Sequence, residues 1–229
     1  MGCSQMRMPV PKELDGKTPA MPVTTKKAWH IFDITKISFG PFAASKFKMG
    51  WDRSGSTTVD VYAASDFSKK YSFALKQGTG DAWQCDCAVK AMKKEVKGKL
   101  LGGDLHIPIK NKTSLNCTFT GSSSDSVWTL AISKNANETD AFTGELSGGG
   151  EKFQIESVEE VDGQRFKTFG EPSGYVYRIG ETLVGAAETL GKGRVWISPD
   201  STGTLRPQLA LASTALIVFQ GVLGSVDKK

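Results

Sequence analysis

Histidine is scarce in this chain of 229 residues, which has only His30 and His106. The chain also has no Gly-x-Ser-x-Gly, no His-Glu-x-x-His and no glycine-rich phosphate loop. These are local motifs of serine hydrolases, zinc peptidases and P-loop nucleotide hydrolases. The sequence therefore predicts no catalytic residue and no cofactor. A hydrolase with an unrecognised site is the one enzymatic alternative that we keep.

A large net charge is also missing, since positive and negative residues nearly balance and the formal net charge is only +5. A charge of this size, without a nucleic-acid reader motif, does not indicate a nucleic-acid partner. Lysine is concentrated in one short stretch, which has two interpretations. It is either a patch for anionic lipid headgroups or a solvated hairpin tip whose charges protect a strand edge. Its members are Lys90, Lys93, Lys94, Lys97 and Lys99.

Only four cysteines are present, and Cys3 stands apart from the others in Met-Gly-Cys-Ser-Gln. Gly-Cys-Ser matches the lipobox of a bacterial lipoprotein precursor written without its signal peptide, and Cys3 would then carry the lipid anchor. Alternatively, Gly2 is myristoylated and Cys3 palmitoylated, although Met6 stands where that motif has Ser or Thr. A third alternative is that the tripeptide has no function.

The other cysteines fall on two predicted strands. Cys85 and Cys87 project to the same face of one strand, and Cys117 lies on a later one. In an oxidising compartment one of the pair should bridge to Cys117. We favour Cys87–Cys117, which would stabilise the fold by roughly 3 kcal/mol. Cys85–Cys117, or three reduced thiols, are the alternatives. The spacing lacks the paired ligands of structural zinc sites, so no metal site is predicted.

No apolar run is long enough to span a bilayer without interruption. Crossing takes about 20 mostly apolar residues, whereas Arg206, Gln208 and Gln220 interrupt the stretch Leu205–Leu223. Its composition favours a helix that is apolar on every side, and such a helix must be enclosed. We expect it to be buried inside the protein.

The N-terminal residues 4–27 contain four prolines and no apolar periodicity. We interpret residues 1–27 as a lipid anchor followed by a flexible tether. Residues 28–229 show no break in composition, which predicts a single domain.

From residue 29 onward, short alternating segments are separated by turn residues. Ser65–Lys70 and the lysine-rich stretch are interpreted as connections between strands. The predicted strands are Trp29–Thr35, Ser45–Arg53, Thr57–Ala63, Tyr71–Lys76, Ala82–Met92, Leu105–Ile109, Ser114–Thr120, Ser126–Ser133, Ala141–Ser147, Glu151–Val161, Gln164–Phe169, Gly174–Ile179, Thr182–Leu190 and Arg194–Ser198.

About twelve antiparallel strands and one apolar helix can bury their apolar surfaces against one another in only a few arrangements. A closed barrel of that size leaves a lumen too wide for side chains alone, and a helix about 10–12 Å in diameter fits it. The sequence therefore predicts a mainly β fold, a single closed antiparallel barrel around a buried C-terminal helix.

This architecture resembles the tubby C-terminal domain, its plant relatives of the LURP-one type and the phospholipid scramblases. The local sequence also resembles uncharacterised bacterial lipoproteins of this shape. No phosphoinositide-binding motif is present to carry across from tubby. The residues that carry the resemblance are 40–42, 48–54, 71–75, 170–175, 191–197 and the terminal helix.

These observations together predict a non-enzymatic binding or structural protein of the bacterial cell envelope, held by Cys3 in the membrane on a periplasmic or surface face. The resemblance implies, as the alternative, binding or handling of anionic lipid by the barrel. A partner protein of the envelope is the other expected class of ligand.

The lipid anchor predicts a specific mass. Protein purified from its native membrane fraction should be heavier by a diacylglyceryl and an acyl group on Cys3, and lighter by two hydrogens for one disulfide. Intact-mass spectrometry measures both. An unmodified, fully reduced chain would contradict the anchor and the envelope location together.

Overall fold

The computed structural model describes residues 6–27, 34–59, 62–100, 103–121, 127–135, 141–162, 171–200 and 205–226. Cys3, His30 and the predicted strand Gln164–Phe169 lie outside these ranges. The described chain forms fourteen strands and one helix. In chain order these are β1 Met21–Pro22, β2 Thr24–Lys27, β3 Ile34–Phe39, β4 Phe42–Met49, β5 Arg53–Val59, β6 Tyr62–Gln77, β7 Ala82–Leu100, β8 Gly103–Gly121, β9 Val127–Asn135, β10 Thr143–Gly148, β11 Glu151–Val158, β12 Gly174–Ile179, β13 Thr182–Glu188, β14 Arg194–Ile197 and α1 Leu205–Val226.

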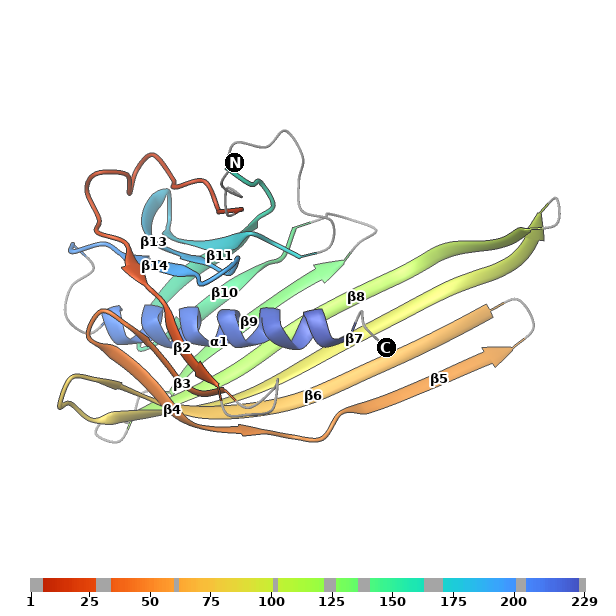
Figure 1. Cartoon of the computed structure of the whole chain (residues 1–229), viewed down its shortest axis with the longest axis horizontal. Helices are drawn as coiled ribbons and strands as arrows, with labels where there is room; N and C mark the ends of the chain where they lie inside the picture. Colours follow the sequence, from red (N-terminus) through yellow and green to blue (C-terminus); the bar gives the residue numbers. More distant parts are fainter. Residues whose placement is uncertain are drawn as a thin grey trace.

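All strands belong to one antiparallel sheet that curls around α1 (Figure 1). Most neighbours in the sheet are also neighbours in the chain, in the order β1-β14-β13-β12-β11-β10-β9-β8-β7-β6-β4-β3-β2, with β5 paired to β6 alone. Up-and-down pairing of this kind needs only short connections, which fits the turn residues between the segments. The predicted barrel-like sheet around a C-terminal helix is confirmed.

The helix is enclosed on every side along its middle. Leu209, Ala210, Leu211, Ala212 and Leu216 have no exposed surface, and α1 contacts strands on both sides of the sheet's closure, among them β4, β6, β13 and β14. By length and composition the segment from residue 205 to 224 qualifies as a membrane span, yet 72% of it is buried among the strands. The prediction of a buried helix is therefore confirmed.

Two hydroxyl residues of the helix, Ser213 and Thr214, are satisfied inside this apolar interior. Ser213 Oγ donates to the carbonyl oxygen of Leu209 at 2.7 Å, and Thr214 Oγ1 donates to Ala210 in the same way at 2.9 Å. Because the single Ser213 proton is used, the Tyr177 hydroxyl at 2.9 Å must be the donor to Ser213 Oγ. These hydrogen bonds remove the cost of burying polar groups.

The expected flexible tether is wrong for residues 6–27. Met8 and Leu14 are buried against Trp196 on the outside of β12–β14, in a second small core. The Met8 amide donates to Glu188 Oε1 at 2.8 Å, and the same carboxylate forms a 2.7 Å ion pair with Arg194. Isolated apolar residues among prolines gave no periodic pattern, so only tertiary contacts reveal their role.

This N-terminal segment also bridges the two ends of the nearly closed sheet. β1 pairs with β14, and β2, one residue further along, pairs with β3. Between them, the Val23 amide donates to the Gly193 carbonyl at 3.1 Å. Gly193 has φ +74°, a conformation that favours glycine. Residues 21–27 therefore join the two ends of the sheet.

Three long strands carry the sheet beyond the barrel. β6, β7 and β8 have 16, 19 and 19 residues, and with β5 their far halves project past the C-terminal end of α1 (Figure 1). We call this part, residues 53–59, 62–68, 90–100 and 103–114, the extension. The predicted connections at Ser65–Lys70 and in the lysine-rich stretch are wrong, because both lie within strands of the extension.

A charge placed on the enclosed part of α1 should prevent folding. Leu216→Asp would bury an unpaired carboxylate where no surface is exposed. The matched control is Gly221→Asp, on the exposed side of the same helix, where an added Cβ meets no atom within 4 Å. We expect the control to stay soluble with a cooperative thermal transition and Leu216→Asp to lose both. Equal behaviour of the two variants would contradict the enclosure.

Candidate functional site

The predicted lysine patch does not form one surface. Side chains alternate along β7, so Lys90 and Lys94 lie on the outer face of the sheet. Lys93 lies on the inner face, where it lines a small hollow with Phe67 and Ala91. The side chains of Lys97 and Lys99 lie outside the described residues. Strand geometry therefore divides a cluster that looked continuous in the sequence.

Lys90 instead belongs to a row of lysines that runs diagonally across four strands. Lys48 on β4 is opposite Ser72, two residues from Lys70 on β6. Lys70 is opposite Ala88, two residues from Lys90 on β7. Lys90 is in turn opposite Ser114, two residues from Lys112 on β8. We call Lys48, Lys70, Lys90 and Lys112 the lysine diagonal.

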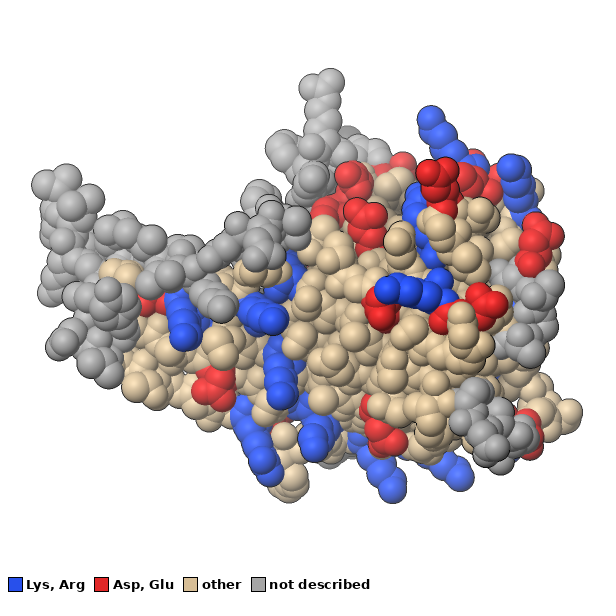
Figure 2. Space-filling model, turned by 180° about the vertical axis from the view of Figure 1, so that it is seen from behind, with Lys and Arg blue, Asp and Glu red and all other residues tan. Residues whose placement is uncertain are grey.

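The four members of the lysine diagonal are exposed, like-charged neighbours. Diagonal pairs on one sheet face are about 7–8 Å apart, so their ammonium groups repel one another, and within the described chain none of the four is in an ion pair. Figure 2 shows basic side chains gathered on this face beside the barrel. Asp66 and Asp86 flank the row, and Arg53 adds a further cation. An anionic ligand would relieve the repulsion.

A hollow of about 630 Å³ lies at the barrel end of the lysine diagonal. Its charged rim consists of Lys48, Lys70 and Asp86, and its floor includes Ser72 and Ala88. Small side chains at these outward positions leave the space open, while long lysine side chains border it. The site is therefore a shallow basic depression on a sheet face and not an enclosed pocket.

Sequence reasoning missed the lysine diagonal because its members are far apart in the chain. Each lies about one hairpin from the next, and only the register of four strands brings them together. A lysine every 20 to 22 residues was the one available signal, and it has no meaning until the strand pairing is known.

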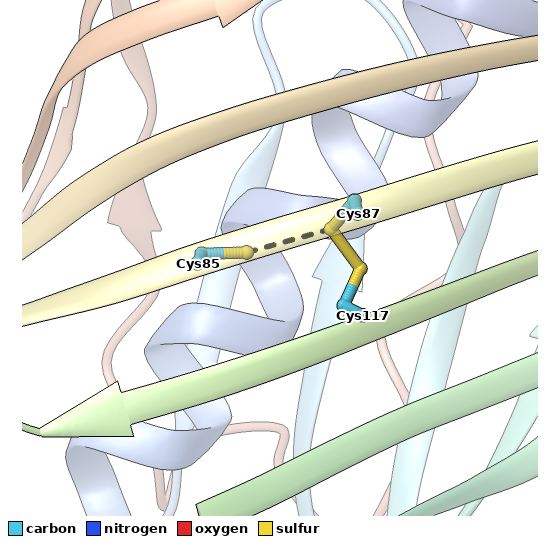
Figure 3. A group of neighbouring side chains, drawn as sticks. All are labelled: Cys85, Cys87 and Cys117. Atoms are coloured by element: carbon cyan, nitrogen blue, oxygen red, sulfur yellow. Dashed lines mark hydrogen bonds between the residues drawn. A yellow bond between two sulfur atoms is a disulfide. The ribbon is translucent and has the colours of Figure 1, made fainter.

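The three described cysteines meet on the inner face of β7 and β8. Cys87 is directly opposite Cys117, with Cα atoms 4.1 Å apart, and the two are joined in a disulfide. Cys85, two residues earlier on β7, is a free thiol whose Sγ lies 3.4 Å from Cys87 Sγ (Figure 3). All three are buried in the core between the sheet and α1.

Burial makes this cluster chemically inert in the disulfide form. Desolvation raises the pKa of the Cys85 thiol, and the charge of Asp86 raises it further. The nearby Tyr71 hydroxyl donates to the Ala215 carbonyl of α1 at 2.7 Å, and burial likewise raises its pKa well above the usual value. Cys85 therefore stays a neutral thiol, unsuited to nucleophilic attack.

No family model matches the chain, and no similar curated protein or solved structure was found.

The disulfide ties together the two strands that lead into the extension, and its removal should destabilise the fold. We expect Cys87→Ser with Cys117→Ser to lower the free energy of unfolding by about 3 kcal/mol, the value for a loop of some 30 residues. Urea unfolding followed by tryptophan fluorescence measures the change. Cys85→Ala, which leaves the bridge intact, is the control and should lose clearly less. A double variant as stable as the wild type would show that the bridge contributes nothing.

Proposed function

We propose that this chain is a lipid-anchored protein of the bacterial cell envelope with a non-enzymatic binding role, and that the lysine diagonal is its binding surface for anionic lipid headgroups. The observation that carries the proposal is the row of four exposed lysines on one sheet face, none of which forms an ion pair with another described residue. A line of evenly spaced cations on a flat surface suits many small anions side by side better than one enclosed ligand.

The filled interior supports an external binding surface. α1 and the inward side chains of the strands occupy the barrel, and the largest of them, such as Phe73, Phe119 and Phe219, have no exposed surface. Among the described residues, the buried groups with shifted pKa values are Cys85 and three tyrosines, all kept neutral by burial. Neither a ligand cavity nor an activated nucleophile is formed by the described part of the interior.

The docked N-terminal segment supports a position close to the membrane. Met8 is fixed on the barrel, so a lipid on Cys3 is separated from the barrel by few residues. Five residues at about 3.3–3.6 Å each reach from Cys3 to Met8, a span of about 18 Å at most. A lipid on Cys3 would therefore hold the barrel within about 20 Å of the leaflet that carries the anchor.

The resemblance to the tubby and scramblase barrels points in the same direction, since it implies a lipid ligand. A partner protein of the envelope is the second candidate. It is favoured by one observation: among the described strands, exposed β5 pairs with β6 alone, and the adjacent Trp51 is 95% exposed. An edge strand of this kind accepts a further strand from a partner.

Flotation with vesicles tests the lipid proposal directly. The full chain with Cys3→Ser, which removes the anchor, is mixed with phosphatidylcholine vesicles with or without phosphatidylglycerol. We expect binding only to the anionic vesicles. Lys70→Gln with Lys90→Gln should weaken binding about thirtyfold, because each lysine near the surface contributes about 1 kcal/mol.

The control is Lys93→Gln with Lys192→Gln, which has the same net charge. Lys93 lies on the inner face and Lys192 in the turn before β14, so this pair should bind nearly as well as the parent. Equal weakening by both pairs would mean non-specific attraction and would reject the lysine diagonal. Absence of binding to anionic vesicles would reject lipid as the ligand.

A further inference from the structure

The buried cysteine cluster has a second chemical state, because its disulfide can be reduced. In the disulfide form two of the three sulfurs are bonded to each other, and only Cys85 is free. Reduction would leave three thiols from adjacent positions on one sheet face. In the present geometry all three Sγ atoms already lie within 4.8 Å of one another.

We infer that the reduced chain binds one Cu(I) ion through Cys85, Cys87 and Cys117. Three sulfurs that surround one ion at about 2.3 Å lie roughly 4 Å from each other. The separation of the Cys85 and Cys87 sulfurs, 3.4 Å, is close to this value. Once their bond is broken, Cys87 and Cys117 can reach it by side-chain rotation, without movement of the paired backbone.

The surroundings of the cluster favour Cu(I) over Zn(II). Thiolates are soft ligands that suit both ions, but structural zinc sites almost always have four protein ligands. Among the described residues, no histidine or carboxylate completes the cluster, and Asp86 between the cysteines points to the outer face. Three sulfurs in an apolar core form a trigonal site, which suits a soft monovalent cation.

The site and the disulfide exclude each other. A phosphine reductant and one water convert the disulfide into two thiols and a phosphine oxide. Cu(I) then binds without electron transfer, and each thiol that becomes a thiolate releases one proton to the solvent. Oxidation of the pair removes two of the three ligands at once. The inference is independent of the lysine diagonal, which lies on the opposite face of the sheet.

The experiment uses the full chain with Cys3→Ser, so that the remaining thiols are those of the cluster. Under anaerobic conditions the phosphine-reduced protein is titrated against the coloured Cu(I)–bicinchoninate complex. We expect transfer of one Cu(I) per chain, with none to the oxidised protein. Reduced Cys85→Ala and Cys85→Ser should each bind Cu(I) at least about tenfold more weakly, since one of three ligands is lost.

Circular dichroism of each sample accompanies the titration. Four results would overturn the inference: no transfer to the reduced chain, equal transfer to the oxidised chain, undiminished affinity in both Cys85 variants, or loss of the strand signal on reduction. Undiminished affinity in both Cys85 variants would assign copper to Cys87 and Cys117 alone. No transfer to the reduced chain would leave Cys85 as a small buried side chain of the core, with no role in binding copper.

Discussion

The whole structure depends on enclosing one helix that has no polar face. Residues 209–216 of α1 expose no side chain to solvent, and burying them requires a sheet that surrounds the helix completely. Closure of that sheet assigns a structural role to residues 21–27, which join β14 to β3. Tyr71 and Tyr177 then hold the helix by hydrogen bonds to the Ala215 carbonyl and Ser213, so the axial position of α1 is specified by polar contacts in an otherwise apolar core.

Sequence patterns predicted those parts of the fold whose faces differ in polarity. The helix and most barrel strands have a buried side, so periodicity identified them. The side chains of the extension whose burial is described are exposed or half-buried on both faces, and the exposed residues 53–58 of β5 have no apolar alternation. Its strands form because the core halves of β6 and β7 continue in register with their partners. The burial of Met8 and Leu14 was not predicted, because two isolated apolar residues give no periodic pattern. They become part of a core only through their tertiary contact with Trp196.

The residues of the candidate site were harder to predict than the fold. Lys90, Lys93 and Lys94 are adjacent in the chain, yet strand alternation divides them between two faces. Lys48 and Lys112 are 64 positions apart in the numbering and lie on one face through the register of four strands. Proximity across a sheet depends on register, and a single sequence does not contain it. Cys87 and Cys117 were predictable as a pair because chemistry, and not spacing, limits a disulfide to few partners.

The position of α1 after all fourteen strands has a consequence for biogenesis. None of the strands can pack its inner face until the helix has been synthesised, and the sheet closes only when residues 21–27 meet β14. Pairing between the two ends of the chain gives the native state a high contact order, which slows folding. Completion of the native core therefore waits until translation has passed the last strand and α1. Until then the apolar inner faces of the strands lack their helical partner, which leaves the incomplete chain prone to aggregation.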